Sequence, residues 1–258
     1  MTASSLARIA RFYDDDYRDY DRDIPFIAAL ARQEGGPILE LGSGSGRVLL
    51  PLAQQGHQVT GLDVSPDLMA LARQKLAGRP WRERVTLIED DFRTADLKGR
   101  TFRFAFSTSN TFMHVTDPGE QLQTLQNVHR HLAAGGLLML DFFNPDVARL
   151  TEMNGVQELA DRWTSASTSA DVIKWSVRTV DWAAQTLETL FIYEEFLPDG
   201  TSRRTLCPFI LRFLWPNEAE LMLRAAGFTV EAILGDFDGD PYHSGSERLI
   251  LLARKDEA

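Results

Sequence analysis

Glycine recurs at every second position after a short apolar run near residue 40. Residues Ile38–Leu41 read Ile-Leu-Glu-Leu, and glycines follow at 42, 44 and 46. This run predicts a buried strand that ends in a tight turn, and a helical pattern begins at about Arg47. Strand, glycine turn and helix together open a nucleotide-binding βα unit, whose helix N-terminus offers free N–H groups. The sequence therefore predicts an α/β fold built on a parallel sheet.

The spacing of these glycines argues against a dinucleotide site. The dinucleotide fingerprint G-x-G-x-x-G needs its third glycine at position 47, where this chain has Arg47. Glu40, two residues before the first glycine, is also unexpected beside a pyrophosphate. An NAD-linked oxidoreductase stays open as an alternative, as does a binding module that lacks catalysis.

Acidic residues follow the next two predicted strands. Asp63 closes the run 58–62, roughly 20 residues after the glycine turn, where a carboxylate can accept both ribose hydroxyls of a nucleoside. Ser65 and Pro66 then predict the N-cap and first turn of a helix. The next run, Val85–Glu89, is followed by Asp90 and Asp91. The order of these features predicts one ligand site along the ends of the strands.

The pattern Glu40-x-Gly-x-Gly-x-Gly, followed in order by Asp63 and Asp90, resembles the class I S-adenosylmethionine-dependent methyltransferases. The resemblance implies S-adenosyl-L-methionine as cofactor, S-adenosyl-L-homocysteine as product, and a Rossmann-like, seven-stranded, mostly parallel sheet with helices on both faces. It implies that Asp90 reaches the exocyclic amine of adenine and that the backbone of Asp91 faces the ring edge. The cofactor residues that it implies are Tyr20, Glu40, Gly42, Ser43, Gly44, Arg47, Asp63, Val64, Asp90, Asp91, Phe92 and Ser107.

The remainder of the chain supplies the later elements of such a fold. We expect a fourth strand over Phe102–Ser107, a helix over 118–132 closed by a glycine C-cap at 135–136, and a fifth strand over 137–142. The chain ends in a helix (217–226), a strand from Phe228 and a last strand (248–253), similar to the closing antiparallel hairpin of the family.

Residues 143–215 form an expected insert after the fifth strand. The stretches 172–180 and 186–196 alternate apolar and polar residues, Pro198-Asp-Gly200 is a turn signal, and 205–215 is another apolar strand. We expect an antiparallel β insert that lies over the ends of the parallel strands, as a substrate lid or a dimer contact. The predicted domains are a cofactor-binding core with an N-terminal helical cap (1–142), this insert (143–215), and a C-terminal helix and hairpin (216–258).

His114 and Tyr13 are the candidate catalytic residues. His114 follows the fourth strand, where the family places its reacting groups, and a general base helps when the acceptor arrives protonated. A histidine that is merely hydrogen-bonded in a loop is the alternative. Residues 12–20, which read Phe-Tyr-Asp-Asp-Asp-Tyr-Arg-Asp-Tyr, predict an ordered helix and resemble the N-terminal segment of sugar N-methyltransferases. That resemblance implies that Tyr20 contacts the amino-acid end of the cofactor and Tyr13 the acceptor.

Composition limits the partners. The net charge is −10, which does not suit a nucleic-acid backbone, and no apolar run is long enough to span a membrane. The single cysteine, Cys207, and the absence of a signal-peptide pattern suit the cytoplasm. No metal-ligand spacing is present, and Ser107-Thr108 lacks the acid that metal-dependent catechol-type enzymes need after strand 4, so no metal is expected.

The sequence thus predicts a cytoplasmic S-adenosylmethionine-dependent methyltransferase that acts on a small molecule. An amine nitrogen is the expected acceptor atom, and an oxygen acceptor is the alternative. No nucleic-acid or membrane partner is expected, and a homodimer is possible. Methyl transfer from a sulfonium is an in-line displacement in which the protein mainly positions the nucleophile.

Overall fold

The computed structural model describes residues 3–165 and 168–256. Its main sheet has seven strands in the order β10-β11-β5-β4-β1-β2-β3. The neighbours from β5 to β3 run parallel, whereas β11 is antiparallel to both β5 and β10. This confirms the predicted Rossmann-like, mostly parallel sheet. The strands are β1 (Ile38–Leu41), β2 (Val59–Asp63), β3 (Val85–Glu89), β4 (Phe102–Ser107), β5 (Leu132–Phe143), β10 (Phe228–Leu234) and β11 (Arg248–Lys255).

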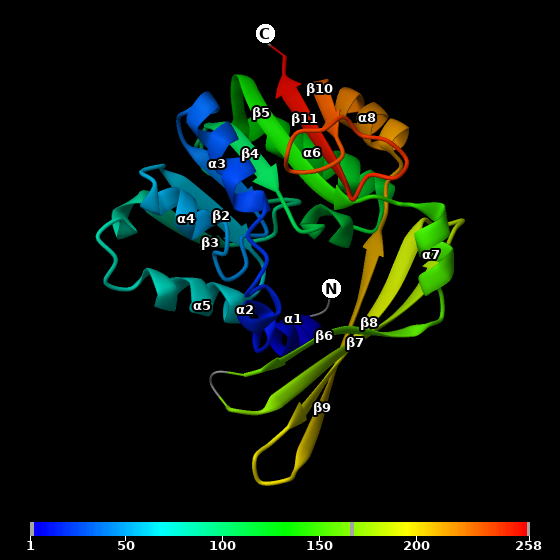
Figure 1. The fold of residues 1–258 in the computed structure, drawn as a ribbon. Helices are drawn as coiled ribbons and strands as arrows, with labels where there is room; N and C mark the ends of the chain where they lie inside the picture. The colour runs from blue at the N-terminus through cyan, green and yellow to red at the C-terminus, as the bar shows by residue number, and fades with distance from the viewer. Residues whose placement is uncertain (1–2, 166–167, 257–258) are drawn as a thin grey trace.

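The main sheet is buried on both faces, as a parallel sheet requires. Ile38 and Phe104 pack in the cluster on one face, while Leu39 and Ala105 pack in the cluster on the other. Helices cover the two faces (Figure 1). They are α3 (Asp23–Glu34), α4 (Leu49–Gln54), α5 (Pro66–Leu76), α6 (Pro118–His131) and α8 (Pro216–Ala225), with short 3₁₀ turns η1 (Arg82–Arg84) and η2 (Thr111–His114). As predicted, Ser65 caps α5, because its Oγ accepts a hydrogen bond from the N–H of Leu68.

A second, antiparallel sheet follows β5 and confirms the predicted insert. It has four strands in the order β6-β7-β8-β9, and it lies below the main sheet in Figure 1. The sequence predicted three of these strands but neither β6 nor the helix that precedes it. Whether residues 143–215 fold as a unit of their own stays a prediction. The elements are α7 (Val147–Met153), β6 (Gln157–Thr164), β7 (Asp171–Asp181), β8 (Thr186–Phe196) and β9 (Ser202–Arg212).

The glycines after α6 have a different role from the one predicted. The helix ends at His131, and β5 begins at the next residue, so no glycine caps α6. Phe102 pairs with Leu132, but Phe104 pairs with Leu137, so extra residues bulge from β5 at this point. Gly135 lies in the bulge with φ +66°, a backbone conformation that glycine adopts without cost.

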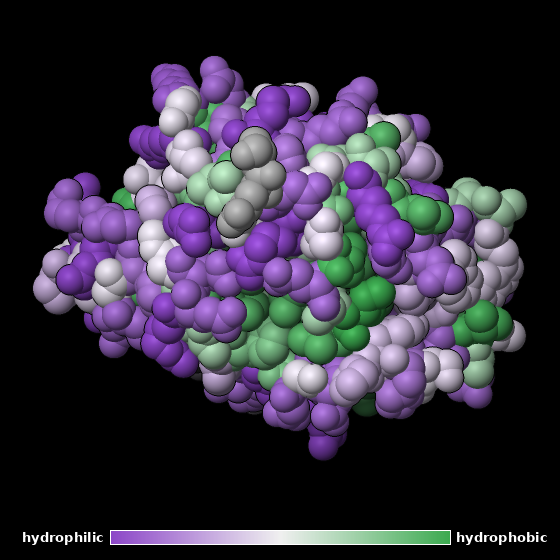
Figure 2. Space-filling model, turned by 90° about the horizontal axis from the view of Figure 1, so that it is seen from above, coloured by the Kyte–Doolittle hydropathy of each residue, from purple (hydrophilic) through white to green (hydrophobic). Residues whose placement is uncertain are grey.

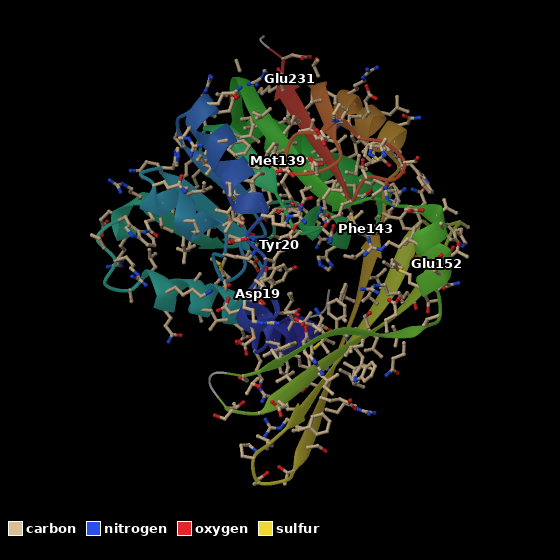
Figure 3. The ribbon with its side chains drawn as sticks, viewed as in Figure 1. Asp19, Tyr20, Met139, Phe143, Glu152 and Glu231 are labelled. Carbon is tan, nitrogen blue, oxygen red and sulfur yellow. The ribbon has the colours of Figure 1, made fainter. Side chains whose placement is uncertain are left out.

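The N-terminal segment is ordered, but it is not the single helix predicted around residues 12–20. It forms α1 (Ala3–Ala10), the four-residue α2 (Tyr13–Asp16) and a turn that carries Tyr17 and Tyr20. Tertiary contacts account for the break, because Asp14 pairs with Lys75 of α5 whereas Asp16 pairs with Lys174 of β7. Figure 3 shows Tyr20 near the middle of the molecule, between the two sheets.

The face of the molecule seen from above is mostly hydrophilic (Figure 2). Figure 2 shows this from above, with one patch of hydrophobic side chains among the polar ones. The whole chain has 37 acidic and 27 basic residues, in keeping with that surface. Within the two described stretches, no helix combines the length and the apolar character needed to cross a membrane.

Candidate active site

The glycine turn after β1 lies at the carboxyl edge of the parallel strands, where open α/β sheets bind ligands. Gly42 has φ +72°, and a Cβ at this position would lie 2.1 Å from Cγ2 of Thr111. Gly44 has φ +53°, and a Cβ there would lie 3.4 Å from the hydroxyl of Tyr13. Both positions favour glycine because of their left-handed backbone, and at Gly42 a side chain would also clash with Thr111.

Asp63 fixes the shape of this edge. Its carboxylate accepts hydrogen bonds from the backbone N–H groups of Gly44 (2.7 Å) and Ser65 (2.8 Å). Burial raises the pKa of Asp63, and these backbone hydrogen bonds oppose the rise. Asp90 lies beside it, because its backbone N–H donates to the carbonyl of Asp63 (3.2 Å). The two predicted ligand acids thus share one edge of the sheet.

Three buried polar atoms at this edge have no hydrogen-bond partner among the described residues. They are Oε2 of Glu40, Nε of Arg47 and Oγ of Ser107. Burial raises the pKa of Glu40 well above its ordinary value, and the charge of Arg47 partly offsets this effect. An unsatisfied carboxylate oxygen and an unsatisfied guanidinium N–H fit a ligand that carries both an ammonium and a carboxylate. The amino-acid end of S-adenosylmethionine is such a group.

A buried network of charges supports the same edge. Both terminal nitrogens of Arg47 donate to Asp23 at the start of α3 (2.7 and 2.5 Å). The hydroxyl of Thr108 lies within hydrogen-bond distance of Asp23 (3.1 Å) and of Asp141 (3.0 Å). Asp141 is fully buried and pairs with Arg248 at 2.6 Å. The network joins α3, the glycine turn and the ends of β4, β5 and β11.

Three tyrosines of the N-terminal segment cover the glycine turn. The ring of Tyr13 lies 4.8 Å from that of Tyr17, which lies 6.0 Å from that of Tyr20. The guanidinium of Arg47 lies over the rings of Tyr17 and Tyr20, at 5.2 and 5.1 Å. Burial raises the pKa of all three hydroxyls, that of Tyr20 to about 12, so each is protonated at neutral pH.

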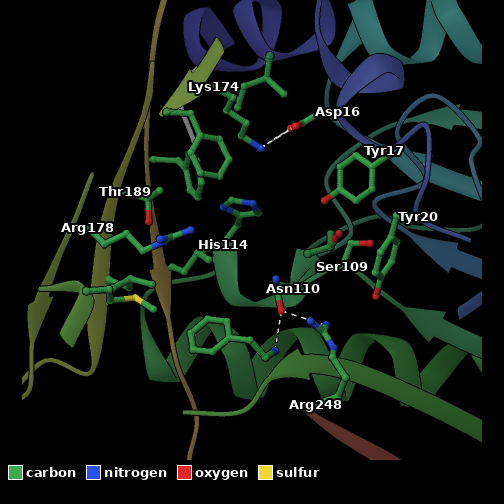
Figure 4. A pocket seen from close by; sticks show the side chains of 18 of the residues that line it. Asp16, Tyr17, Tyr20, Ser109, Asn110, His114, Lys174, Arg178, Thr189 and Arg248 are labelled. Carbon is green, nitrogen blue, oxygen red and sulfur yellow. Dashed lines mark hydrogen bonds and ion pairs between the residues drawn. The ribbon is translucent and has the colours of Figure 1, made fainter. Parts of the chain in front are cut away.

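The tyrosines open onto a pocket of about 470 Å³, a usual size for a small-molecule site. The four-stranded sheet supplies one wall and η2 another (Figure 4). One face of this sheet lines the pocket, and its role as a substrate lid stays a prediction. The opposite face exposes Leu206 and Ile210, and its contact with a second copy stays a prediction. The residues that line the pocket include Tyr13, Tyr17, Tyr20, His114, Arg149, Lys174, Arg178 and Thr189.

His114 lies in the wall of this pocket. Its Nδ1 atom is buried and has no hydrogen-bond partner in the part of the chain that the structure describes. A hydrogen bond to the backbone of Ile210 therefore uses the other ring nitrogen. Burial lowers the pKa of His114 to about 4, so the imidazole is neutral at physiological pH. A neutral ring whose Nε2 donates leaves Nδ1 as a hydrogen-bond acceptor.

The other predicted cofactor residues lie at the same edge, and they differ in exposure and in hydrogen bonding. Ser43 is buried beside Gly42, and Val64 follows Asp63 with 48 % of its surface exposed. Asp91 is less free, since both its oxygens accept hydrogen bonds from Arg93. That pairing leaves the backbone of Asp91, and the half-buried Phe92 after it, to face a ligand.

Sequence analysis missed several residues of this region. Asp141 could have been found, because an acid within an apolar strand is a usual sign of a site. Asp23, Arg178 and Thr189 carried no such signal, since long-range packing alone brings them here. Within residues 3–165 and 168–256, no group of three or more His, Cys, Asp or Glu side chains is arranged to hold a metal ion.

Replacing Glu40 by glutamine is expected to stabilise the ligand-free protein and to weaken cofactor binding. The expected gain is about 1–3 kcal/mol in the free energy of unfolding, because the variant no longer buries an unpaired carboxylate. The folded-state pKa of Glu40 is raised, so the gain should grow as the pH rises above the ordinary glutamate range. Urea unfolding and calorimetric titration with S-adenosylhomocysteine measure the two effects. Lower stability of Glu40→Gln would show that the carboxylate is satisfied in the free protein.

Comparison with known proteins agrees with this geometry. Residues 38–136 match a family profile described as a methyltransferase domain. The cypemycin N-terminal methyltransferase of a Streptomyces species is 28 % identical over 235 residues, which cover 90 % of this chain and 89 % of the relative. The methyltransferase CcbJ of Streptomyces caelestis superimposes with a TM-score of 0.85 at 25 % identity, over 99 % of this chain and 100 % of that one.

A third protein carries the cofactor in its solved structure. S-adenosylmethionine-bound CalS10 of Micromonospora echinaspora, an amino pentose methyltransferase, has a TM-score of 0.73 at 23 % identity. The match covers 94 % of this chain and 96 % of CalS10. The unsatisfied Glu40 and Arg47 atoms of this chain fit S-adenosylmethionine as a cofactor. Residues 38–136 of this chain thus match a methyltransferase domain, and nearly the whole chain is similar to S-adenosylmethionine-dependent methyltransferases.

Proposed function

We propose that this methyltransferase acts on an amine nitrogen of a small molecule. The observation that carries the proposal is the unpartnered Nδ1 of His114 in the pocket wall, next to the tyrosines. Such an acceptor suits an amine, which brings N–H groups and arrives protonated at neutral pH. The cypemycin N-terminal methyltransferase supports it further, because its name places its acceptor at an N-terminus.

The residues at the edge of the sheet would hold the cofactor. Asp63 would accept the ribose hydroxyls and Asp90 the adenine amine, while Glu40 and Arg47 would bind the amino-acid end. Tyr20, whose ring packs on Arg47, belongs to the same end. When bound, S-adenosylmethionine supplies a methyl group that is already activated on a sulfonium. The remaining cofactor residues of the proposal are Gly42, Ser43, Gly44, Val64, Asp91, Phe92 and Ser107.

The pocket residues would position the neutral form of the acceptor amine. His114 Nδ1 accepts a hydrogen bond from the amine and fixes the direction of its lone pair. Tyr13 lies against the glycine turn and also lines the pocket, so its hydroxyl can contact the acceptor next to the cofactor site. The half-buried tyrosines limit water at this point. Position and orientation are the main contributions that this reaction needs from the protein.

A screen of matched acceptors tests the proposal. Pairs of small molecules that differ only in an amine or a hydroxyl are incubated with the protein and S-adenosylmethionine whose methyl group is deuterated. Mass spectrometry then reports which member gains the labelled methyl. We expect transfer to the amines. Transfer to the hydroxyl members alone would refute the amine and establish the alternative oxygen acceptor.

Replacing His114 by asparagine is expected to lower kcat by about 100-fold, because the amine loses the hydrogen bond that orients it, with little change in S-adenosylhomocysteine affinity. His57→Gln, which changes a loop histidine outside the pocket, is the matched control. Because the pKa of His114 is lowered to about 4, the wild-type pH profile of kcat/KM should lack a limb at the ordinary histidine value of 6.5. Equal activity of His114→Asn and wild type would assign this residue to structure alone.

A further inference from the structure

One end of the pocket, where α7 meets β7, carries excess positive charge. Arg178 of β7 and Arg149 of α7 both line it. Burial is the main cause that lowers the pKa of the Arg178 guanidinium, and the charge of Arg149 lowers it further. The two guanidinium groups therefore act on each other. Glu158 pairs with Arg178 at 3.0 Å, but its side chain is 45 % exposed. Arg149 has no ion pair among the described residues, so one carboxylate faces two guanidinium groups.

Thr189 adds a neutral donor to the same place. It is the cross-strand partner of Arg178 in the β7–β8 ladder, so the two side chains lie on the same face of the sheet. Thr189 is 4 % exposed, yet its hydroxyl has no hydrogen-bond partner among the described residues. Figure 4 shows Arg178 and Thr189 side by side, both directed into the pocket. A buried hydroxyl without a partner is costly unless a ligand satisfies it.

The surroundings make this end a separate subsite within the pocket. Figure 4 shows Arg178 and Thr189 on one side, Tyr17 and Tyr20 on the other, and His114 between them. Apolar side chains of α7 and the sheet, Leu150, Met153, Leu187 and Leu211, line the pocket around the arginines. Such surroundings strengthen the attraction between the half-buried Arg178 guanidinium and an anion, whereas Arg149 is exposed and adds its charge from the rim.

The other charges of the pocket are already neutralised. Lys174 pairs with Asp16 at 2.5 Å, and Arg248 pairs with the buried Asp141. Glu247, the remaining acid in the wall, pairs with Arg22. Arg178 also has N–H donors that Glu158 does not use, because only its Nη1 atom donates a hydrogen bond to that residue. The unbalanced charge therefore lies at Arg149 and Arg178.

We propose that Arg178, Thr189 and Arg149 bind an oxyanion of the methyl acceptor, either a carboxylate or a phosphate. The acceptor would then carry its amine beside His114 and its anionic group at the opposite end of the pocket. Arginine suits this task, since its planar fork donates two parallel hydrogen bonds to either kind of oxyanion. The assignment rests on the proposed function, because it identifies the substrate class of the same site.

Calorimetric titration of the S-adenosylhomocysteine-loaded protein with inorganic pyrophosphate and with malonate tests the subsite. We expect both anions to bind, and the one that binds more tightly tells whether the acceptor carries a phosphate or a carboxylate. Arg178→Gln should weaken binding by about tenfold or more, as expected for the loss of a charged hydrogen-bond partner. Thr189→Val, which keeps the shape of the side chain, should weaken it by a smaller factor.

Two controls match these variants. Arg204→Gln changes another arginine of the same sheet, which pairs with Glu194 and does not line the pocket. Thr179→Val changes an exposed threonine one residue from Arg178, on the opposite face of β7. Neither should alter anion binding. Anion affinity that is absent, or equal in wild type and Arg178→Gln, would overturn the subsite. The proposed function would still stand in that case, because S-adenosylhomocysteine binding and amine methylation are measured separately.

Discussion

Asp63→Ala should weaken S-adenosylhomocysteine binding by about 3 kcal/mol or more, which is over about 100-fold in the dissociation constant. The variant loses the contact proposed for the ribose and also the two hydrogen bonds that hold the N–H groups of Gly44 and Ser65. The loop that presents the backbone to the ligand then has no anchor. Calorimetric titration measures the change directly.

Two further variants make this result specific. Asp63→Asn keeps one oxygen acceptor and should fall between wild type and Asp63→Ala. Asp67→Ala removes an exposed acid four residues later, in the first turn of α5, and should bind the cofactor product as wild type does. Undiminished affinity of Asp63→Ala would exclude Asp63 from the site.

The second large effect concerns stability. Replacing Arg47 by methionine should lower the free energy of unfolding by about 3–5 kcal/mol, because Asp23 would remain buried without its partner. Asp23 is 0 % exposed, and its remaining contact is the Thr108 hydroxyl. The pair ties α3 to the helix that follows the glycine turn. Urea unfolding measures the loss.

The charge, rather than the volume of the side chains, should decide that loss. The double variant Arg47→Met/Asp23→Leu should recover most of the stability, since two apolar residues leave no buried charge. Arg73→Met breaks an exposed pair with Glu89 at 3.6 Å and should cost at most about 1 kcal/mol. A similar loss in Arg73→Met and Arg47→Met would mean that burial of the Arg47 pair has no special importance.

The main sheet could be predicted because its signals are local. The strands β1, β2 and β3 are short apolar runs that end in, or are followed by, a glycine or an acid, and β1 and β4 were found at their observed bounds. Asp63 and Asp90 were found because the carboxyl ends of neighbouring parallel strands meet at one edge. A fixed spacing along the chain is enough to place such residues together.

The N-terminal segment and the pocket wall depend on contacts that spacing does not reveal. Asp16 is 158 positions from Lys174 in the chain, yet their ion pair helps to end α2 after four residues. Asp23 and Arg178 are likewise fixed by long-range pairs. The role of Gly135 was also misjudged, since a glycine after a helix usually marks its cap, and only the register of β4 and β5 shows the bulge.

Parallel calorimetric titrations with S-adenosylmethionine, S-adenosylhomocysteine and NAD test the central claim most directly. The geometry of Glu40, Arg47 and Asp63 predicts that both adenosyl ligands bind at one site per chain and that NAD does not. Binding of NAD alone would instead support the oxidoreductase considered from the sequence. Failure of all three ligands to bind would contradict the cofactor site itself, and with it the methyltransferase account.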